Sequence, residues 1–435
     1  MNADKSLRIF HNQYLYCPNT NTLINKEIED IYFKYAAQSR NVSLEAIPVD
    51  RETIQRNIKR LKQIIIETCQ DCSLNCLYCI FGSNKYFYTR KQSSLKISYD
   101  IAKNAIDYIY NFICNRKKKE LSIGFYGGEP LLNFQVIKKI VEYSKKKFKN
   151  WSLIFTVTTN CTVLNDDIIY FLIKNNFKTL ISLDGPAENH DAKRVFPDGS
   201  GSFDIVIKNI KKIRSINPHY YQDMVTFSIV YSKDLSLKKL YHFFKSNELV
   251  KKNFSNFGYV TDSDTTYYEH YSYNPHRLKR DRKYVFNKIL KQIREKQELS
   301  PIETNFIIEH SILKKALNAR SFNVLSSTCY YEERLFVSAD GKFHFCEKIN
   351  DKFPIGSVEN GFDYPRMIEI VNEYISVIKK YCAKCELRFI CMRCYANLAR
   401  NGYFEIDKEF CDNAKYSIKK MFEELIQINE AKAVK

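Results

Sequence analysis

An alternation of strand-like and helix-like segments between residues 62 and 260 constrains the fold of this chain more than any other feature. Short apolar runs recur, and amphipathic segments with helical periodicity separate them. Repeated units of this kind build a parallel sheet with right-handed crossover connections. The expected strands are residues 63–67, 121–126, 153–158, 179–183, 225–230 and 256–260, and the expected helices lie near residues 98–115, 133–148, 164–174, 203–214 and 235–246.

A parallel sheet of this kind also predicts where functional residues gather. Whether the sheet closes into a barrel or stays open, binding and catalytic groups lie at the carboxyl ends of its strands. The cysteine, glycine and polar motifs of the first half of the chain follow the ends of the first four expected strands. We therefore expect the functional residues at this edge of the sheet.

The cysteine content narrows the class of protein. Fourteen cysteines in 435 residues are too few for a small disulfide scaffold and many for an ordinary cytosolic enzyme. The N-terminal residues are polar and charged, unlike a secretory signal, and no apolar run is long enough to cross a membrane. We expect a cytoplasmic protein, without a membrane partner, whose reduced thiols bind metal.

The net charge of +19 permits an anionic partner. The Lys and Arg residues are spread along the chain, however, which favours a solvated surface over a nucleic-acid-binding stripe. We therefore expect no nucleic-acid partner. A zinc-stabilised nucleic-acid-binding protein, with structural cysteines and a functional basic charge, is the alternative from another class.

Three cysteines follow the first expected strand, in the segment Cys72-Ser-Leu-Asn-Cys76-Leu-Tyr-Cys79. A loop with three thiolates can hold an iron–sulfur cluster and leave one iron open to a further ligand. Because Cys69 lies three residues before Cys72, a structural zinc site with four thiolates is the alternative. The spacing favours the iron–sulfur cluster.

A glycine pair follows the second expected strand. Glycine is rare here, with 12 in 435 residues, so a pair at a strand end is informative. Glycine lets a backbone approach a ligand and present its amide and carbonyl groups, and a tight turn is the alternative interpretation. The segments after the second, third and fourth strands are Gly127-Gly128-Glu129-Pro130, Thr158-Thr159-Asn160 and Ser182-Leu183-Asp184-Gly185-Pro186, and His190-Asp191-Ala192-Lys193-Arg194 follows the last of them.

The three-cysteine loop resembles the cluster loop of the radical S-adenosylmethionine (SAM) superfamily, in which an aromatic residue precedes the last cysteine, as Tyr78 does here. The resemblance implies a [4Fe–4S] cluster on Cys72, Cys76 and Cys79. SAM would bind the fourth iron and be cleaved reductively to a 5′-deoxyadenosyl radical. The implied fold is α/β, a partial (β/α)6 TIM-type barrel of the radical SAM type.

The following strand ends extend the resemblance. In the family, a Gly-Gly-Glu segment binds the amino group of SAM, which implies contacts from Gly128 and Glu129. The Ser-Leu-Asp-Gly-Pro segment with a downstream arginine is typical of sulfatase and peptide maturases, in which the serine and arginine contact SAM. This implies contacts from Ser182 and Arg194, and a guanidinium suits a carboxylate through its forked donors. Tyr78 completes the expected cofactor-binding residues.

Seven further cysteines lie within residues 329–411, and two pairs of them have Cys-x-x-Cys spacing. The tract resembles the SPASM domain, which carries two auxiliary [4Fe–4S] clusters in peptide-modifying radical enzymes. Two structural zinc sites are the alternative. The resemblance implies that Cys329, Cys346 and Cys394 hold the first auxiliary cluster, and that Cys382, Cys385, Cys391 and Cys411 hold the second.

This tract departs from the family at one point, because two residues separate Cys391 from Cys394 where the family usually has three. The first cluster also has three cysteines only, so that one iron is open or takes another ligand. Glu347 directly follows Cys346, where sulfatase maturases place an acidic general base. We expect Glu347 to accept a substrate proton, and an exposed surface carboxylate is the alternative.

These features divide the chain into five parts. They are a small α+β extension (residues 1–60), the radical SAM core (61–260), a helical connector (261–325), the SPASM domain (326–415) and a C-terminal helix (416–435). The extension is expected to contain a hairpin near residues 14–24 and a helix over 27–38. The connector is expected to contain helices at 278–297 and 303–318, and the pattern of the C-terminal helix spans 413–430. The extension suits a leader peptide that adds a strand to a sheet edge.

The function predicted from this organisation is that of a radical SAM/SPASM maturase. It would install a thioether or carbon–carbon cross-link in a ribosomally made precursor peptide and take electrons from a donor such as a flavodoxin or ferredoxin. An anaerobic sulfatase-maturating enzyme, which makes formylglycine, is the alternative among enzymes.

Overall fold

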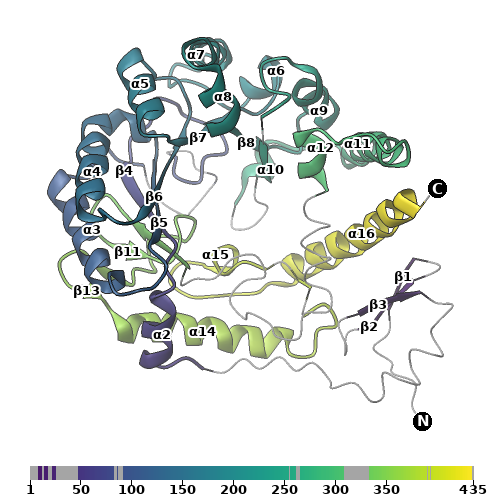
Figure 1. Ribbon diagram of the computed structural model, residues 1–435. Coiled ribbons are helices and arrows are strands. Elements are labelled where there is room, and N and C mark those ends of the chain that lie inside the picture. Colours follow the sequence, from purple (N-terminus) through teal and green to yellow (C-terminus); the bar gives the residue numbers. More distant parts are fainter. Residues whose placement is uncertain are drawn as a thin grey trace.

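The central sheet of the molecule has eight strands in the order β11-β10-β4-β5-β6-β7-β8-β9. The computed structural model in Figure 1 describes residues 8–11, 14–17, 22–25, 48–82, 86, 92–253, 255–260, 265–307, 333–388, 390–391 and 393–433. All six predicted strands are present and parallel, which confirms the α/β class and the barrel-type sheet. They are β4 (Gln63–Cys69), β5 (Glu120–Gly127), β6 (Ser152–Thr159), β7 (Lys178–Ser182), β8 (Val225–Tyr231) and β9 (Ser255–Tyr259).

Helices follow the first five of these strands and form an arc around the outside of the curved sheet (Figure 1). Several begin at a side-chain cap: the oxygens of Ser98, Asn165 and Ser236 accept hydrogen bonds from backbone amides of the first turn. The five helices that the sequence predicts are α3 (Tyr99–Ile113), α4 (Phe134–Lys147), α5 (Asp166–Lys174), α7 (Phe203–Ile216) and α9 (Leu237–Ser246), and the short elements between them are η2 (Pro130–Asn133), α6 (Ala187–His190) and α8 (Pro218–Met224).

The two faces of the sheet differ in exposure. Along β7 and β8, burial alternates with a period of two: outward residues such as Ile181 and Phe227 pack in the core, and inward residues are half-exposed. Parallel sheets are usually apolar and covered on both faces. An inner face that is polar and half-exposed is therefore available to a ligand. Its polar residues include Ser122, Thr156, Thr158, Ser182, Thr226 and Ser228, and Leu180 and Val230 lie on the same face.

Two short strands from the cysteine-rich tract extend the sheet beyond β4. β10 (Arg334–Val337) pairs in parallel with β4, and β11 (Phe343–His344) pairs antiparallel with β10. Sequence analysis did not predict these strands, because runs of four and two residues carry too little periodicity. Their pairing joins the tract directly to the edge of the barrel sheet.

The N-terminal segment forms a separate antiparallel sheet in the order β1-β2-β3, which confirms the predicted hairpin. Its strands are β1 (Arg8–His11), β2 (Tyr14–Cys17) and β3 (Thr22–Asn25). Tyr16 is buried, and its ring lies 5.4 Å from that of Phe422 in the C-terminal helix α16 (Lys408–Ala433). The helix predicted over residues 27–38 lies outside the described residues.

Helices connect the barrel to the cysteine-rich tract. The backbone of Val49, just before α2 (Arg51–Ile58), exchanges hydrogen bonds of 2.8 and 3.0 Å with the side chain of Asn372 in α14 (Tyr364–Cys382). Arg282 of α11 (Pro275–Arg294) forms a bidentate ion pair with Glu424 of α16, at 3.1 and 3.0 Å. The barrel, the N-terminal sheet and the tract therefore pack against one another through α2, α11, α14 and α16.

The predicted connector and terminal helices are found as α11 and α16, and the predicted helix over 303–318 lies partly outside the described residues. The remaining elements are α10 (Tyr267–His270), α12 (Pro301–Phe306), β12 (Gly356–Ser357), β13 (Gly361–Phe362) and α15 (Tyr395–Leu398). Within the ranges that the structure describes, helices that combine the length and apolarity of a membrane span are absent.

Candidate functional site

The loop after β4 brings Cys72, Cys76 and Cys79 together at the carboxyl edge of the sheet. Burial raises the pKa of the Cys72 and Cys76 thiols to about 12 and that of Cys79 to about 11, and each of the three is raised further by the charge of another. Negative charge on these sulfurs therefore needs a positive metal centre beside it. Three neighbouring thiols on one buried loop are a donor set that fits an iron–sulfur cluster.

A single metal ion requires a different arrangement of ligands from that of a cluster. In the described part of the chain, groups of three or more His, Cys, Asp or Glu side chains that could hold one metal ion are absent. A [4Fe–4S] cluster is larger than an ion, and each of its cysteines binds a different iron. Its ligands therefore surround a volume and do not converge on one point.

The backbone of neighbouring segments fixes the cysteine loop from two sides. The amides of Gly128 and Glu129 donate to the carbonyls of Cys69 and Asp71, at 2.8 and 2.9 Å. A Cβ atom on Gly128 would lie 2.3 Å from the Asp71 carbonyl oxygen, so only glycine fits there. On the other side, the amides of Asn75 and Leu77 donate to the carbonyls of Val195 and Lys193, at 2.7 and 2.9 Å.

Glu129, predicted to contact SAM, uses its side chain to join two strand ends. The carboxyl group is 0% exposed and accepts hydrogen bonds from Thr159 Oγ1 at 2.8 Å, from the Asn160 amide at 2.7 Å and from the Leu131 amide at 3.1 Å. Burial raises the pKa of Glu129 to about 7. The half-exposed backbone of Gly128 is the part of this segment that lies open to a ligand.

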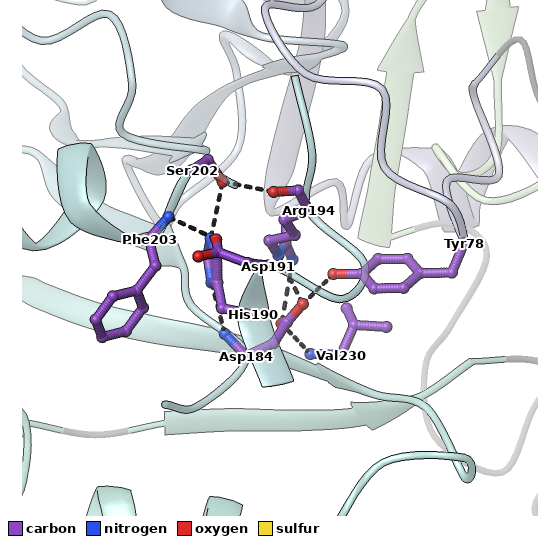
Figure 2. A network of polar contacts seen from close by, with 8 residues as sticks. All are labelled: Tyr78, Asp184, His190, Asp191, Arg194, Ser202, Phe203 and Val230. Atoms are coloured by element: carbon purple, nitrogen blue, oxygen red, sulfur yellow. Dashed lines mark hydrogen bonds and ion pairs between the residues drawn. The ribbon is translucent and has the colours of Figure 1, made fainter. Parts of the chain in front are cut away.

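Asp184, at the end of β7, is the centre of a buried polar network (Figure 2). Its carboxylate accepts from Arg194 Nε at 2.7 Å and Nη2 at 3.3 Å, from the Val230 amide at 2.8 Å and from the Tyr78 hydroxyl. Asp184 is 1% exposed and Arg194 7% exposed. The Arg194 guanidinium also lies 5.3 Å from the centre of the Tyr78 ring. The network ties the cysteine loop to the ends of β7 and β8.

His190 forms hydrogen bonds with Asp184 and Ser202 of this network (Figure 2). Its Nδ1 accepts from the Asp184 amide at 3.3 Å, so the ring proton resides on Nε2, which lies 3.0 Å from Ser202 Oγ. Ser202 in turn donates to the Arg194 carbonyl at 2.8 Å. Burial lowers the pKa of His190 to about 3. The neutral imidazole therefore fixes the backbone on both sides of the Asp184–Arg194 ion pair.

Ser182 lies at the end of β7 on the inner face of the sheet, opposite Ser228 of β8, and is half-exposed. Ser182 was predicted from the sequence to bind the cofactor, whereas the other polar residues of this face were not predicted. Their signal was the period-two alternation of small polar and large apolar residues, which is unusual in parallel strands. Tyr126 of β5 also lies on this face, where burial and, to a lesser extent, the charges of Glu347, Cys79 and Cys346 raise the pKa of its hydroxyl.

Glu347 is buried, so the alternative of an exposed surface carboxylate is wrong. Its oxygens accept from Arg334 Nη1 at 3.1 and 3.3 Å, and Cys346 Sγ donates to it at 3.3 Å. The charge of Glu347 acts on the Tyr126 hydroxyl, so this carboxylate lies near the inner face of the barrel.

A cavity of about 200 Å³ adjoins Cys346. Its lining includes Arg334, Phe345 and Tyr395. The charge of Cys394 adds to the burial that raises the pKa of Cys346 to about 12, so the structure brings these two predicted ligands near each other. The third predicted ligand, Cys329, lies outside the described residues.

Four other cysteines gather where α14 ends and α16 begins. Cys382 ends α14, Cys411 lies in the first turn of α16, and Cys385 and Cys391 lie between them. Burial raises the pKa of Cys382 to about 11, and the charges of the other three contribute. The structure therefore brings together all four residues predicted to hold the second auxiliary cluster.

A loop with three thiols lies beside an open polar face, at the carboxyl edge of a parallel barrel-type sheet. This arrangement defines an α/β protein that can hold a metal cluster next to a ligand. Residues 66–245 match the model of the Radical SAM superfamily. This part of the chain is a radical SAM domain, as the cysteine loop predicted.

Two relatives match most of the chain. The radical SAM cyclopropyl synthase TigE of Paramaledivibacter caminithermalis is 24% identical over an alignment of 456 positions, which covers 97% of this chain and 87% of that protein. A cysteine-type anaerobic sulfatase-maturating enzyme of Clostridium perfringens is 23% identical over 374 residues, which cover 81% and 96%. The chain spans half the length of two further relatives.

The fold has a solved counterpart in native anSMEcpe with bound AdoMet. The two structures align with a TM-score of 0.65 at 21% identity, over 86% of this chain and 100% of the other. The alignment shows that the fold is shared.

Proposed function

We propose that this protein is a radical SAM maturase that installs a thioether or carbon–carbon cross-link in a ribosomally made precursor peptide. The observation that carries the proposal is the gathering of Cys382, Cys385, Cys391 and Cys411 beside the Cys346–Cys394 pair, in a tract that resembles the auxiliary-cluster domain of peptide-modifying radical enzymes. The match to a cyclopropyl synthase over nearly the whole chain supports bond formation, because closing a cyclopropane ring joins two carbons.

When bound to Cys72, Cys76 and Cys79, a reduced [4Fe–4S] cluster supplies the electron that cleaves SAM into methionine and a 5′-deoxyadenosyl radical. The chain's own residues bind and orient SAM. The half-exposed backbone at Gly128 suits the ammonium group, Ser182 on the inner face suits a polar group, and the charge of Arg194 attracts the carboxylate. Asp184 and Tyr78 hold Arg194 in place beside the cysteine loop.

The two auxiliary sites are proposed to hold [4Fe–4S] clusters. Cys329, Cys346 and Cys394 would hold the first, next to the cavity at Cys346, and the four gathered cysteines would hold the second. Glu347 would accept the proton that the substrate loses, because its charge acts on Tyr126 of the inner face and Arg334 orients its carboxylate. A flavodoxin or ferredoxin would supply the electrons.

The N-terminal sheet is the proposed element for binding a leader peptide. β3 forms one edge of the sheet β1-β2-β3, and an extended peptide can add a strand to such an edge through backbone hydrogen bonds. The sheet is anchored to α16 by Tyr16 and Phe422. If a leader peptide binds at this edge, the remainder of the precursor peptide stays free to enter the barrel.

The test is anaerobic incubation with SAM, a reductant and the peptide encoded beside the gene, followed by mass spectrometry. Each cross-link removes two hydrogens from the peptide: one passes to 5′-deoxyadenosine, and the other would leave as a proton to Glu347 and an electron to an auxiliary cluster. We expect one 5′-deoxyadenosine per pair of hydrogens lost, and no reaction with Cys76→Ala. A peptide that keeps its mass while SAM is consumed would contradict the proposal.

Sulfatase maturation is the second candidate, and the match over 96% of a sulfatase-maturating enzyme favours it. The same assay with a sulfatase peptide distinguishes the two, because formylglycine carries an aldehyde that reacts with hydrazides. Aldehyde formation without loss of hydrogen from the co-encoded peptide would select this alternative.

A further inference from the structure

Two buried polar side chains, Tyr374 and Arg393, lie where the two proposed auxiliary sites adjoin. Tyr374 of α14 is 0% exposed, and Arg393 is 1% exposed and ranks among the largest fully buried side chains. A guanidinium stays charged in proteins, and burying it is costly unless negative charge lies close by. Its position therefore requires a local source of negative charge.

Arg393 is placed beside cysteine sulfur by its position in the chain. It lies between Cys391 and Cys394, which belong to different proposed clusters. The backbone amide and the guanidinium of Arg393 both lower the pKa of Cys391, against the larger effect of burial, which raises it. Its Nη1 donates to the Arg388 carbonyl at 3.0 Å, which fixes the direction of the side chain. The negative charge that Arg393 requires is that of the cysteine thiolates.

Tyr374 has aromatic neighbours around its ring, and one of them, Tyr395, directly follows Cys394 in the chain. The ring centre lies 6.5 Å from that of Tyr395 and 5.3 Å from that of Phe404, both nearly edge-on. Among the residues that the structure describes, none forms a hydrogen bond with the hydroxyl. Cysteines of the tract pack against the same core cluster as Tyr374, among them Cys382 and Cys394.

Leaving a buried hydroxyl without a partner is costly, because it loses its hydrogen bonds to water. Here the groups that act on it electrostatically are Arg393 and the three thiols of Cys394, Cys382 and Cys391. A cluster sulfur is therefore the available acceptor for a hydrogen bond from the Tyr374 hydroxyl.

We propose that Tyr374 and Arg393 raise the reduction potential of the auxiliary clusters that they adjoin, Tyr374 by donating a hydrogen bond to a sulfur and Arg393 by its charge. The inference rests on the proposed presence of those clusters. A [4Fe–4S] cluster becomes more negative by one charge when it takes up one electron, so donors and positive charge stabilise its reduced form. Both are positioning residues, because neither touches the substrate.

The test is a reductive titration of the full-length chain, followed by electron paramagnetic resonance. Replacing Cys72, Cys76 and Cys79 by Ala leaves the auxiliary clusters as the iron centres, and Cys411→Ser identifies the signal of the second one. Arg393→Gln should lower the reduced-to-oxidised ratio at the original midpoint about tenfold, a shift of about 59 mV for one electron. Tyr374→Phe should shift the midpoint in the same direction by less, and Arg393→Lys should lie between wild type and Arg393→Gln.

Matched controls are Tyr416→Phe in α16 and Arg280→Gln in α11, because both side chains are exposed. Neither should shift the midpoint. An unchanged potential in both test variants at full iron content would overturn this inference alone. Absence of iron from the chain with its three loop cysteines replaced would overturn the auxiliary clusters as well. If Arg393→Gln loses iron, Tyr374→Phe, which removes a single oxygen, decides the question.

Discussion

Asp184 shows how one buried residue organises the candidate site. Its carboxylate receives hydrogen bonds from Arg194, from the Tyr78 hydroxyl and from the Val230 amide, and so connects the cysteine loop to two strand ends. Arg194 is predicted to contact SAM, yet two of its nitrogens are already bound to Asp184. The ion pair holds the guanidinium beside the loop before any ligand arrives, which lowers the cost of ordering it on binding.

Asp184→Asn tests this role. The substitution keeps the shape of the side chain and leaves the Arg194 charge buried without its counter-charge. We expect the free energy of unfolding in urea to fall by about 3–5 kcal/mol. Asp198→Asn, in an exposed loop, is the control and should change it by less than about 1 kcal/mol. Equal effects of the two substitutions would contradict the account.

Glu129 gives the site a pH dependence. Its pKa is about 7 in the folded chain, against 4.5 for an ordinary glutamate. Between these values the folded state binds more protons than the unfolded state, so the free energy of unfolding falls as the pH rises from about 4.5 to 7. Glu129→Gln should remove this decline, which amounts to about 3 kcal/mol at most. Urea unfolding of both proteins at pH 5 and 7.5 measures it, and parallel changes in the two would show that Glu129 does not titrate in this range.

At the level of elements, the sequence predicts what local periodicity determines. Six strands and five outer helices follow from apolar runs and amphipathic segments, and the motifs after four of the strands lie at the predicted edge. β10 was missed because its pairing with β4 joins residues more than 200 positions apart in the chain, and β11 was missed because it has two residues and pairs only with β10. Packing also decides the partners of Glu129 and Arg194, which sequence patterns do not show.

We expect the barrel to fold without the N-terminal sheet, whose Tyr16 packs against α16 next to Cys385 and Cys391, provided that the cut precedes Val49. This residue is hydrogen-bonded to Asn372, and α2 beyond it packs on α14. Deletion of residues 1–47 should raise the KM for the precursor peptide at least about tenfold, because a leader would lose its strand partner. The rate of SAM cleavage without peptide should stay unchanged and serves as the control for folding. An unchanged peptide KM would exclude the sheet as the leader-binding element.

At the scale of the whole molecule, three cysteine groups are fixed by one packed framework. β10 joins the cysteine-rich tract to the barrel sheet, and Arg282 and Glu424 join α11 to α16. Glu347 and Tyr126 lie where the tract meets the barrel interior. A substrate in the barrel would therefore lie near both the three-cysteine loop and the proposed auxiliary sites, as the proposed maturase function requires.

The most direct measurement of the central claim is the product formed from SAM. The reconstituted protein, incubated anaerobically with SAM and dithionite, should produce 5′-deoxyadenosine and methionine in equal amounts. Cys76→Ala should abolish both products, whereas Cys114→Ala, which changes a half-buried cysteine at the end of α3, should leave them unchanged. No 5′-deoxyadenosine from the wild-type chain, or equal amounts from Cys76→Ala, would contradict the account.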